Sequence, residues 1–364
     1  MNTQEARAKW QAQKAALEAN GFVALPSVTM YTPDEWKTNA QLAMDAQPTL
    51  STDPNSSIPS ILTTTIDPEI IRAVFAPLQF AEILGERKAG DWLEETRMFP
   101  IVEETGEVSS YGDFNNNGRA GVNLNFPQFQ SYLFQTFQIY GERELARAGL
   151  AKINYVGELG VSAADLLNRY QNLTYAFGVT GLQNYGIINN PYLSAFLSPA
   201  PKAWGGTTWF DNGSPAASAN EVYADIQAMV NKLVLQTNGA LDIKSPMTLA
   251  MSPVSEIAMT FVNSFGVYVE DLLKKGFPNV KVKTAPQYGQ ETAANSQGYS
   301  TVGNVVQLIA DKIQGQKVVW AAFNEKMRAH KIIPEPSSWK QKMTSGTWGA
   351  ILRMPVGVTG MIGV

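Results

Sequence analysis

Residues 91–140 restrict the possible folds of this chain more than any other segment. They read DWLEETRMFPIVEETGEVSSYGDFNNNGRAGVNLNFPQFQSYLFQTFQIY, rich in aromatic and β-branched residues and interrupted by glycine and asparagine clusters. This composition predicts two long strands joined around the turn residues YGDFNNNGRAGVN. A two-stranded ribbon is at best marginally stable in water. A ribbon of this length therefore needs a surface to rest on, and a partner subunit is the natural support.

The ribbon carries an excess of acid. Seven carboxylates stand against the two arginines Arg97 and Arg119, and these acids are Asp91, Glu94, Glu95, Glu103, Glu104, Glu107 and Asp113. Neighbouring residues of a strand point to opposite faces, so neither Glu94 with Glu95 nor Glu103 with Glu104 forms a catalytic dyad by itself. The stretch GDFNNNGRAG lacks the acid spacing and the closing glutamate of a calcium loop. We interpret the acids as solvated or inter-subunit charge.

Composition excludes several classes of site. Charged residues make up only 16 % of the chain, below the typical quarter, which indicates that other subunits cover much of the surface. The net charge of −4, without a basic stripe, argues against a dedicated nucleic-acid grip. The chain has no cysteine and one histidine, His330. Disulfides, iron–sulfur clusters and multi-histidine metal sites are therefore excluded, and we expect neither catalytic residues nor a cofactor.

Membrane association is not expected either. The N-terminal stretch MNTQEARAKWQAQKAALEAN lacks the apolar region of a signal peptide. No run of about eighteen apolar residues occurs, so no transmembrane helix is predicted. These observations predict a soluble protein made inside the cell.

The first half of the chain reads as an arm followed by helices. A polar helix is predicted over Thr3–Asn20, and residues 22–60 then lose all periodicity while keeping apolar anchors, which favours an extended arm. Asp67 followed by proline begins a further helix that stops at Gly85. After the ribbon, helical spacing begins at Glu142. A break is predicted at Gly157 and Gly160, and a second helix start at Ser162. This second helix is predicted to end at Gly178 and Gly181.

The second half alternates helices and strands. An amphipathic helix is predicted within ASANEVYADIQAMVNKLVLQTNG, and a helix begins at Ser252 with proline next. Strands are predicted at MTLAM, NVKVKTA, NVVQLIA and KVVWAAF, and GAILRMPVGVTGMIGV is read as one last buried strand. This pattern indicates an α/β body with a mixed sheet.

The order of these parts resembles the major capsid protein family of tailed bacteriophages, with the fold named for phage Hong Kong Ninety-Seven. In GLQNYGIINNPYL, the family's corner after its long helix is matched by Gly181, Gly186, Ile187, Asn189 and Pro191. VEDLLKKGFPNVKV resembles the helix–Pro-Asn–strand passage of the family's axial domain. The resemblance covers nearly the whole chain. It implies that GLQNYGIINNPYL is a corner between domains and not a ligand cradle.

The resemblance implies an α+β fold of four parts. These are an N-terminal helix and arm (1–90), a long β-hairpin called the E-loop (91–140), a peripheral domain with the spine helix (141–195 with 321–350), and an α/β axial domain (196–320 with 351–364).

The implied function is structural. Copies would form pentamers and hexamers of an icosahedral shell around phage DNA, with each E-loop lying over a neighbour. The acidic ribbon then predicts a basic contact surface on the neighbouring subunit, and the candidate residues for it are Arg143, Arg147 and Lys152. Expected partners are other copies, a portal, scaffolding or decoration proteins, and DNA bound without sequence preference. The expected location is the virion capsid, after synthesis in the host cytoplasm. Because residues 91–140 contain no lysine, the family's Lys–Asn crosslink is not expected in its familiar place.

Two alternatives stay open at this point. One is an encapsulin-like nanocompartment, which shares the fold and encloses an enzyme. The other is a carbohydrate-active enzyme using the paired acids, which predicts a monomer with a pocket of convergent carboxylates.

Overall fold

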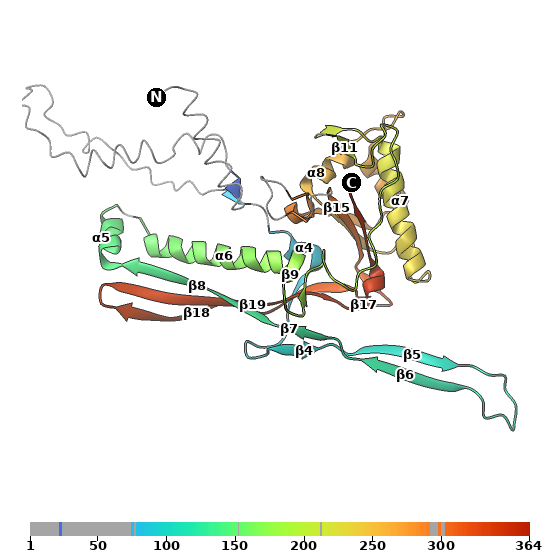
Figure 1. The fold of residues 1–364 in the computed structure, drawn as a ribbon, viewed down its shortest axis with the longest axis horizontal. Coiled ribbons are helices and arrows are strands. Elements are labelled where there is room, and N and C mark those ends of the chain that lie inside the picture. Colours follow the sequence, from blue (N-terminus) through green and yellow to red (C-terminus); the bar gives the residue numbers. More distant parts are fainter. Residues whose placement is uncertain are drawn as a thin grey trace, which may run out of the picture.

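The computed structural model describes residues 78–364, apart from 152, 212, 292–297 and 300–302. Before residue 78 it describes only the short antiparallel pair of β1 (Phe22–Val23) and β2 (Val74–Phe75). The predicted N-terminal helix and most of the predicted arm lie outside the described residues. The described part consists of an axial body, a peripheral sheet covered by a long helix, and a projecting ribbon (Figure 1).

The axial body is built on a four-stranded sheet in the order β14-β13-β15-β20. Its strands are β13 (Met247–Met251), β14 (Val280–Thr284), β15 (Val305–Ala310) and β20 (Val358–Ile362). The pair β13–β14 is parallel, whereas β13–β15 and β15–β20 are antiparallel. Every residue of β13 and β15 is buried, which is why both read as continuous apolar runs. The mixed sheet predicted for this body is confirmed.

Helices complete the axial body as the sequence predicts. They are α7 (Ala219–Gln236), α8 (Pro253–Glu256) and α9 (Val269–Gly276), with the 3₁₀ turns η2 (Ile257–Thr260) and η3 (Pro286–Tyr288). Ser252 caps α8, with proline at the first helical position. Ser218 caps α7, and Glu221 reaches back to the Ser218 backbone N–H to close a capping box.

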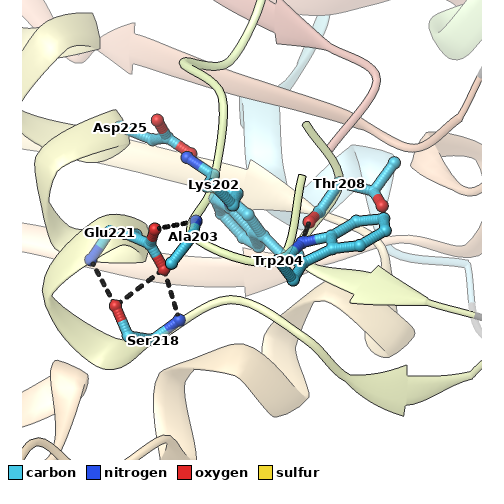
Figure 2. A network of polar contacts seen from close by, with 8 residues as sticks. Lys202, Ala203, Trp204, Thr208, Ser218, Glu221 and Asp225 are labelled. Atoms are coloured by element: carbon cyan, nitrogen blue, oxygen red, sulfur yellow. Dashed lines mark hydrogen bonds and ion pairs between the residues drawn. The ribbon is translucent and has the colours of Figure 1, made fainter. Parts of the chain in front are cut away.

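A loop is held against α7 by buried charge (Figure 2). The Lys202 Nζ atom lies 2.5 Å from Asp225 Oδ2, and the indole Nε1 of Trp209 donates to the same oxygen at 2.8 Å. The backbone N–H of Ala203 donates to Glu221 Oε1 at 2.7 Å. These bonds fix the loop that precedes β11 (Phe210–Asp211) and β12 (Ser214–Pro215), a short antiparallel pair.

The peripheral sheet has the order β3-β18-β19-β8. Its strands are β3 (Glu86–Lys88), β8 (Tyr132–Gly141), β18 (Val319–Glu335) and β19 (Ser338–Leu352). The sequence reading recognises only the first residues of β18 and the last of β19, because the outer half of β18 is exposed and its sequence mixes charged and apolar residues.

The single C-terminal strand predicted over GAILRMPVGVTGMIGV is wrong. That segment divides into the end of β19, the 3₁₀ turn η4 (Pro355–Gly357) and β20. Pro355 has no backbone N–H to donate to a ladder, so the strand stops before it.

Two helices follow β8, and their boundary differs from the prediction. Helix α5 spans Glu142–Leu150 and α6 spans Tyr155–Phe177. The predicted break at Gly157 and Gly160 is wrong, because both glycines lie inside α6, and Ser162 is not its cap. The break falls just before α6, where the Asn154 side chain accepts a hydrogen bond from the Gly157 N–H at 3.2 Å. The helix ends at Gly178, as predicted, with a φ of 69°.

Shorter elements connect these parts. Helix α4 (Phe80–Leu84) ends at Gly85, as predicted. The helix predicted from Asp67 is wrong over Val74–Phe75, because these residues pair with β1 as strand β2, and Asp67 lies outside the described residues. The remaining elements are the antiparallel pairs of β9 (Gly178–Val179) with β10 (Asn184–Tyr185), and of β16 (Lys312–Ile313) with β17 (Gln316–Lys317). None of the helices in the described part of the chain is long and apolar enough to span a membrane.

The ribbon consists of two antiparallel pairs in line. The inner pair is β4 (Thr96–Met98) with β7 (Gln128–Gln130), and the outer pair is β5 (Ile101–Glu107) with β6 (Arg119–Asn125). Proline, which cannot donate to a ladder, stands between the inner and outer pairs on both sides of the ribbon, at positions 100 and 127. The second predicted strand divides, because β8 pairs with β19 in the peripheral sheet.

Candidate assembly surfaces

The outer ribbon has no support from the part of its own chain that the structure describes. Every residue of β5 and β6 is exposed. Val102, Val122 and Leu124 expose 58 %, 59 % and 59 % of their surface, and Phe114 at the tip is fully exposed. Monomeric proteins rarely leave so many apolar side chains in water on one element, so the ribbon is a surface for an interaction.

The acids of the outer ribbon are arranged along its two faces. Glu103 lies opposite Asn123 and Glu104 opposite Val122 in the antiparallel register, whereas Glu107 lies opposite Arg119. Arg119 therefore offsets charge near the tip, and the middle of the ribbon keeps its negative charge.

The root of the ribbon is anchored to the body by aromatic side chains. Phe99 meets Phe129 edge to face with ring centroids 5.4 Å apart, and it meets Trp320 at 6.1 Å. The Arg353 guanidinium lies 4.3 Å above the Trp320 ring. Beside this anchor a cleft of about 560 Å³ separates the ribbon from the body, and Glu104 is among its lining residues.

The three predicted contact residues nearest the root make contacts within the chain. Arg97 Nη1 lies 3.5 Å from Glu94 Oε2, three residues earlier. The carbonyl of Glu95 accepts a hydrogen bond from the Ser131 N–H at 2.8 Å. Glu94 and Arg97 therefore balance part of each other's charge within the chain.

The predicted basic candidates lie at the other end of the molecule. Arg143 and Arg147 are exposed on α5, and Lys152 lies outside the described residues. Figure 1 shows α5 at the distal end of the peripheral sheet, opposite the end from which the ribbon projects. The structure therefore does not bring these arginines to the ribbon of the same chain.

A second basic surface lies on the peripheral sheet. Lys340 Nζ lies 4.6 Å from the centroid of the Phe137 ring, and Lys342 Nζ lies 5.9 Å from it. Phe137 and Ile139 are 45 % and 53 % exposed. We call the surface formed by Leu133, Phe137, Ile139, Lys340 and Lys342 the lysine–aromatic face.

The lysine–aromatic face is the side of the sheet turned away from α6. The intervening residues of β8 point to the helix, since Gln138 Nε2 donates to the Leu159 carbonyl at 3.1 Å and the Phe134 ring lies 4.6 Å from that of Tyr170. Sequence reasoning missed this face because it joins two strands about 200 residues apart in the chain. The alternation in WKQKMT was the available signal.

The corner GLQNYGIINNPYL folds back on the end of α6. The N–H groups of Ile187 and Ile188 donate to the carbonyls of Tyr175 and Ala176 at 2.9 and 3.0 Å. A Cβ on Gly186 would lie 2.1 Å from the Ala176 carbonyl oxygen, so only glycine fits there.

The other predicted corner residues belong to the same turn. Asn189 Nδ2 donates to the Phe177 carbonyl at 2.6 Å. Gly181 has a φ of 87°, and Pro191 begins the exposed turn that follows. These bonds are those of a tight structural turn.

Metal-binding arrangements find no basis in the described residues. No group of three or more histidine, cysteine or acidic side chains is placed there to hold a metal ion. Glu103 and Glu104 lie on an exposed strand. His330 is half-buried, and its Nε2 lies 3.0 Å from Thr344 Oγ1. The convergent carboxylates required by the carbohydrate-active alternative are not present in this part of the chain.

Comparison with solved structures identifies the fold. The capsid of Myoviridae phage XM1 matches with a TM-score of 0.66 and 15 % identity, covering 84 % of this chain and 99 % of that chain. The capsid of a native GTA particle matches with a TM-score of 0.55 and 11 % identity, covering 87 % and 99 %. Mycobacterium phage Ogopogo matches with a TM-score of 0.52 and 10 % identity, covering 83 % and 97 %. These similarities confirm the predicted phage capsid fold.

Comparison of the sequence identifies the family. No curated protein matches this chain. A family model described as "Pa193 gp26 major capsid protein" matches residues 49–363, and it favours the phage capsid over the encapsulin-like alternative. The chain therefore belongs to the Pa193 gp26 major capsid protein family and is a structural protein of a bacteriophage capsid shell.

Proposed function

We propose that copies of this chain form pentamers and hexamers that close an icosahedral shell around phage DNA, with each ribbon lying on the lysine–aromatic face of a neighbour. The observation that carries this proposal is the complete exposure of β5 and β6 together with their apolar side chains. A strand pair of this kind gains most of its stability from what covers it.

The ribbon and the lysine–aromatic face are complementary in two respects. One face of the ribbon carries Glu104 beside Val102, Val122 and Leu124. The lysine–aromatic face carries Lys340 and Lys342 beside the apolar side chains of β8. Pairing the two surfaces covers apolar area on both sides and brings carboxylates toward ammonium groups. Burial of apolar surface contributes about 25 cal/mol per Å², while the charge pairs select the partner and its orientation.

Part of the peripheral sheet is already covered by the chain itself. The Arg328 guanidinium lies 4.9 Å above the Trp92 ring, and that ring lies 6.0 Å from the ring of His330. Trp92 thus covers the sheet near the root of the ribbon. The outer part, with Lys340 and Lys342, is left for a neighbour.

The proposal includes further contacts. Arg143 and Arg147 on α5 are a further basic contact site at the distal end of the subunit. The portal, any scaffolding or decoration protein, and DNA bound without sequence preference are further partners. Synthesis takes place in the host cytoplasm, and the mature protein resides in the virion.

The test is assembly by the purified full-length chain, followed by negative-stain microscopy and light scattering. Closed shells, or rings of five and six, are the expected result for the unchanged chain. The double variant Glu103→Lys with Glu104→Lys should remain folded, as judged by circular dichroism, and should lose shells. Glu256→Lys with Asp271→Lys changes the net charge equally on the axial body and serves as the control. Normal shells from the ribbon variant would refute the proposal.

A further inference from the structure

A small basic pocket lies where α4 meets the edge of the axial sheet. Its volume is about 240 Å³, and four lysines line it. Lys281 and Lys283 come from β14, Lys312 from β16 and Lys317 from β17. We call this site the lysine pocket.

Two of these lysines are fixed by backbone oxygens at the C-terminal end of α4. Lys283 Nζ donates to the Glu82 carbonyl at 2.6 Å, and Lys317 Nζ donates to the Leu84 carbonyl at 2.6 Å. Gly85 makes the second contact possible, because a Cβ there would collide with Lys317 Nζ. An ammonium group has three donors, so each of these lysines can bind a further acceptor in the pocket.

Positive charge exceeds negative charge around the pocket. Its lining contains only two acids, Glu82 and Asp311. Asp311 Oδ1 also accepts a hydrogen bond from Thr248 Oγ1 at 3.0 Å, and Lys283 Nζ lies 3.6 Å from Glu82 Oε1. The four lysines are therefore only partly neutralised.

The cations of the pocket repel one another. Burial lowers the pKa of Lys317, and the charges of Arg87, Lys283 and Lys312 lower that pKa further, against the opposite effect of Asp311. Repulsion of this kind is relieved when an anion enters. The pocket is therefore electrostatically prepared for a compact anion.

We propose that the lysine pocket binds a phosphate group of the nucleic acid that the shell encloses. This inference rests on the proposed function for the presence of the nucleic acid, whereas the site itself rests on the geometry above. A phosphate presents oxygens in several directions from one centre, which suits a small cavity lined by four lysines, two of which have their ammonium groups fixed beside it. The ribbon's carboxylates are instead spread along a flat strand pair and suit the lysine–aromatic face.

The position of the lysine pocket also explains why the sequence alone indicated no nucleic-acid-binding site. Its cations come from residues 281–283 and 312–317, which the fold brings to the end of α4 at residues 82–85. No continuous basic stripe exists in the sequence. A net charge of −4 describes the whole chain and not this site.

The experiment measures binding of a short fluorescein-labelled DNA duplex to the full-length chain by anisotropy, from about 50 to about 200 mM salt. Lys281→Gln with Lys283→Gln should weaken binding about tenfold at the lower salt and reduce the dependence of the affinity on salt. The control, Lys340→Gln with Lys342→Gln, removes equal charge from the lysine–aromatic face and should bind DNA as the unchanged chain does. An equal loss in both variants, or no loss in either, would overturn the proposal.

Further measurements distinguish nucleic acid from free phosphate and from a neighbour's ribbon as the ligand of the pocket. They also distinguish failure of this proposal from failure of the proposed shell function. Inorganic phosphate should displace the duplex from the unchanged chain and have less effect on the pocket variant. If a peptide with the ribbon sequence IVEETGE displaces the duplex equally well, the pocket is a site for a neighbour's ribbon, and the nucleic-acid proposal is wrong. Shell formation by the pocket variant is followed by microscopy. If the pocket variant loses DNA binding but still forms normal shells, phosphate binding by the lysine pocket is supported. If the unchanged chain forms no shells, only the proposed shell function is refuted.

Discussion

Lys202 and Asp225 form an ion pair in which the side chains are only 1 % and 4 % exposed, with 2.5 Å between Nζ and Oδ2. Asp225→Ala leaves the ammonium buried without its partner and also removes the acceptor of the Trp209 indole N–H. We expect a loss of about 3–5 kcal/mol in the free energy of unfolding, measured by urea denaturation of the unassembled chain.

The exposed pair of Lys274 and Glu270 provides the control. Its side chains are 65 % and 54 % exposed, so Glu270→Ala should cost less than about 1 kcal/mol. Replacing both buried partners, by Lys202→Met with Asp225→Leu, should cost less than Asp225→Ala alone, because no charge is then left uncompensated. Equal losses in the two single variants would contradict this account.

The corner after α6 makes a second prediction. Gly186→Ala places a Cβ 2.1 Å from the Ala176 carbonyl oxygen and 2.2 Å from the Phe177 nitrogen, both backbone atoms. The corner must then open, and we expect a loss of more than about 3 kcal/mol in the free energy of unfolding, visible as low soluble yield or a lower Tm. Gly149→Ala in α5, where a Cβ meets nothing within 4 Å, should be neutral or stabilising by up to about 1 kcal/mol.

The start of α7 links stability to pH. Hydrogen bonds from the Ser218 N–H, then from its hydroxyl and from the Ala203 N–H, lower the pKa of Glu221. Because the pKa in the folded state is depressed, the stabilisation is complete above the ordinary pKa of glutamate and is lost as pH falls through the lowered value. Ser218→Ala should cost about 1 kcal/mol near neutral pH.

The measurement for this prediction is Tm between about pH 6 and about pH 3. The difference between Ser218→Ala and the unchanged chain should narrow toward the acid end. Glu221→Gln, which cannot ionise, should remove this part of the pH dependence altogether. A difference that stays constant across the range would show that the Glu221 carboxylate contributes nothing.

The contact between ribbon and neighbour can be tested by exchanging charges. Lys340→Glu with Lys342→Glu should prevent shell formation while leaving the fold intact, because both side chains lie on the surface of the sheet. Combining these changes with Glu103→Lys and Glu104→Lys restores opposite charges across the contact. We expect partial recovery of shells by microscopy, since complementary charges select the partner. If shells instead recover when Arg143 and Arg147 are changed to glutamate together with Glu103→Lys and Glu104→Lys, the ribbon contacts α5 of the neighbour.

The amount that sequence predicts differs between regions for physical reasons. The strands β13 and β15 are recognised because burial on both sides makes them continuously apolar. Ser252, followed by proline, marks a helix start because capping is a local interaction. The exposed ribbon is recognised by its composition, and its acidic excess points to a partner.

Features that depend on distant segments are missed. The break before α6 is decided by the Asn154 cap, whereas Gly157 and Gly160 are tolerated inside the helix, where Gly160 lies close to Gln138 of β8. The outer halves of β18 and β19 form strands because they pair with each other and with β8, and not because their residues are apolar. The lysine–aromatic face and the lysine pocket exist only after such segments meet.

The long hairpin of β18 and β19 has a mechanical consequence. Its inner end belongs to the axial core through Val319 and Ala321, and its outer end lies at the distal tip of the peripheral sheet (Figure 1). The hydrogen bonds of an antiparallel pair run across the strands. A force that slides one strand along the other therefore loads many hydrogen bonds at once, whereas a force that peels the two strands apart breaks them one after another. A subunit built in this way is stiff in one direction and yields in the other.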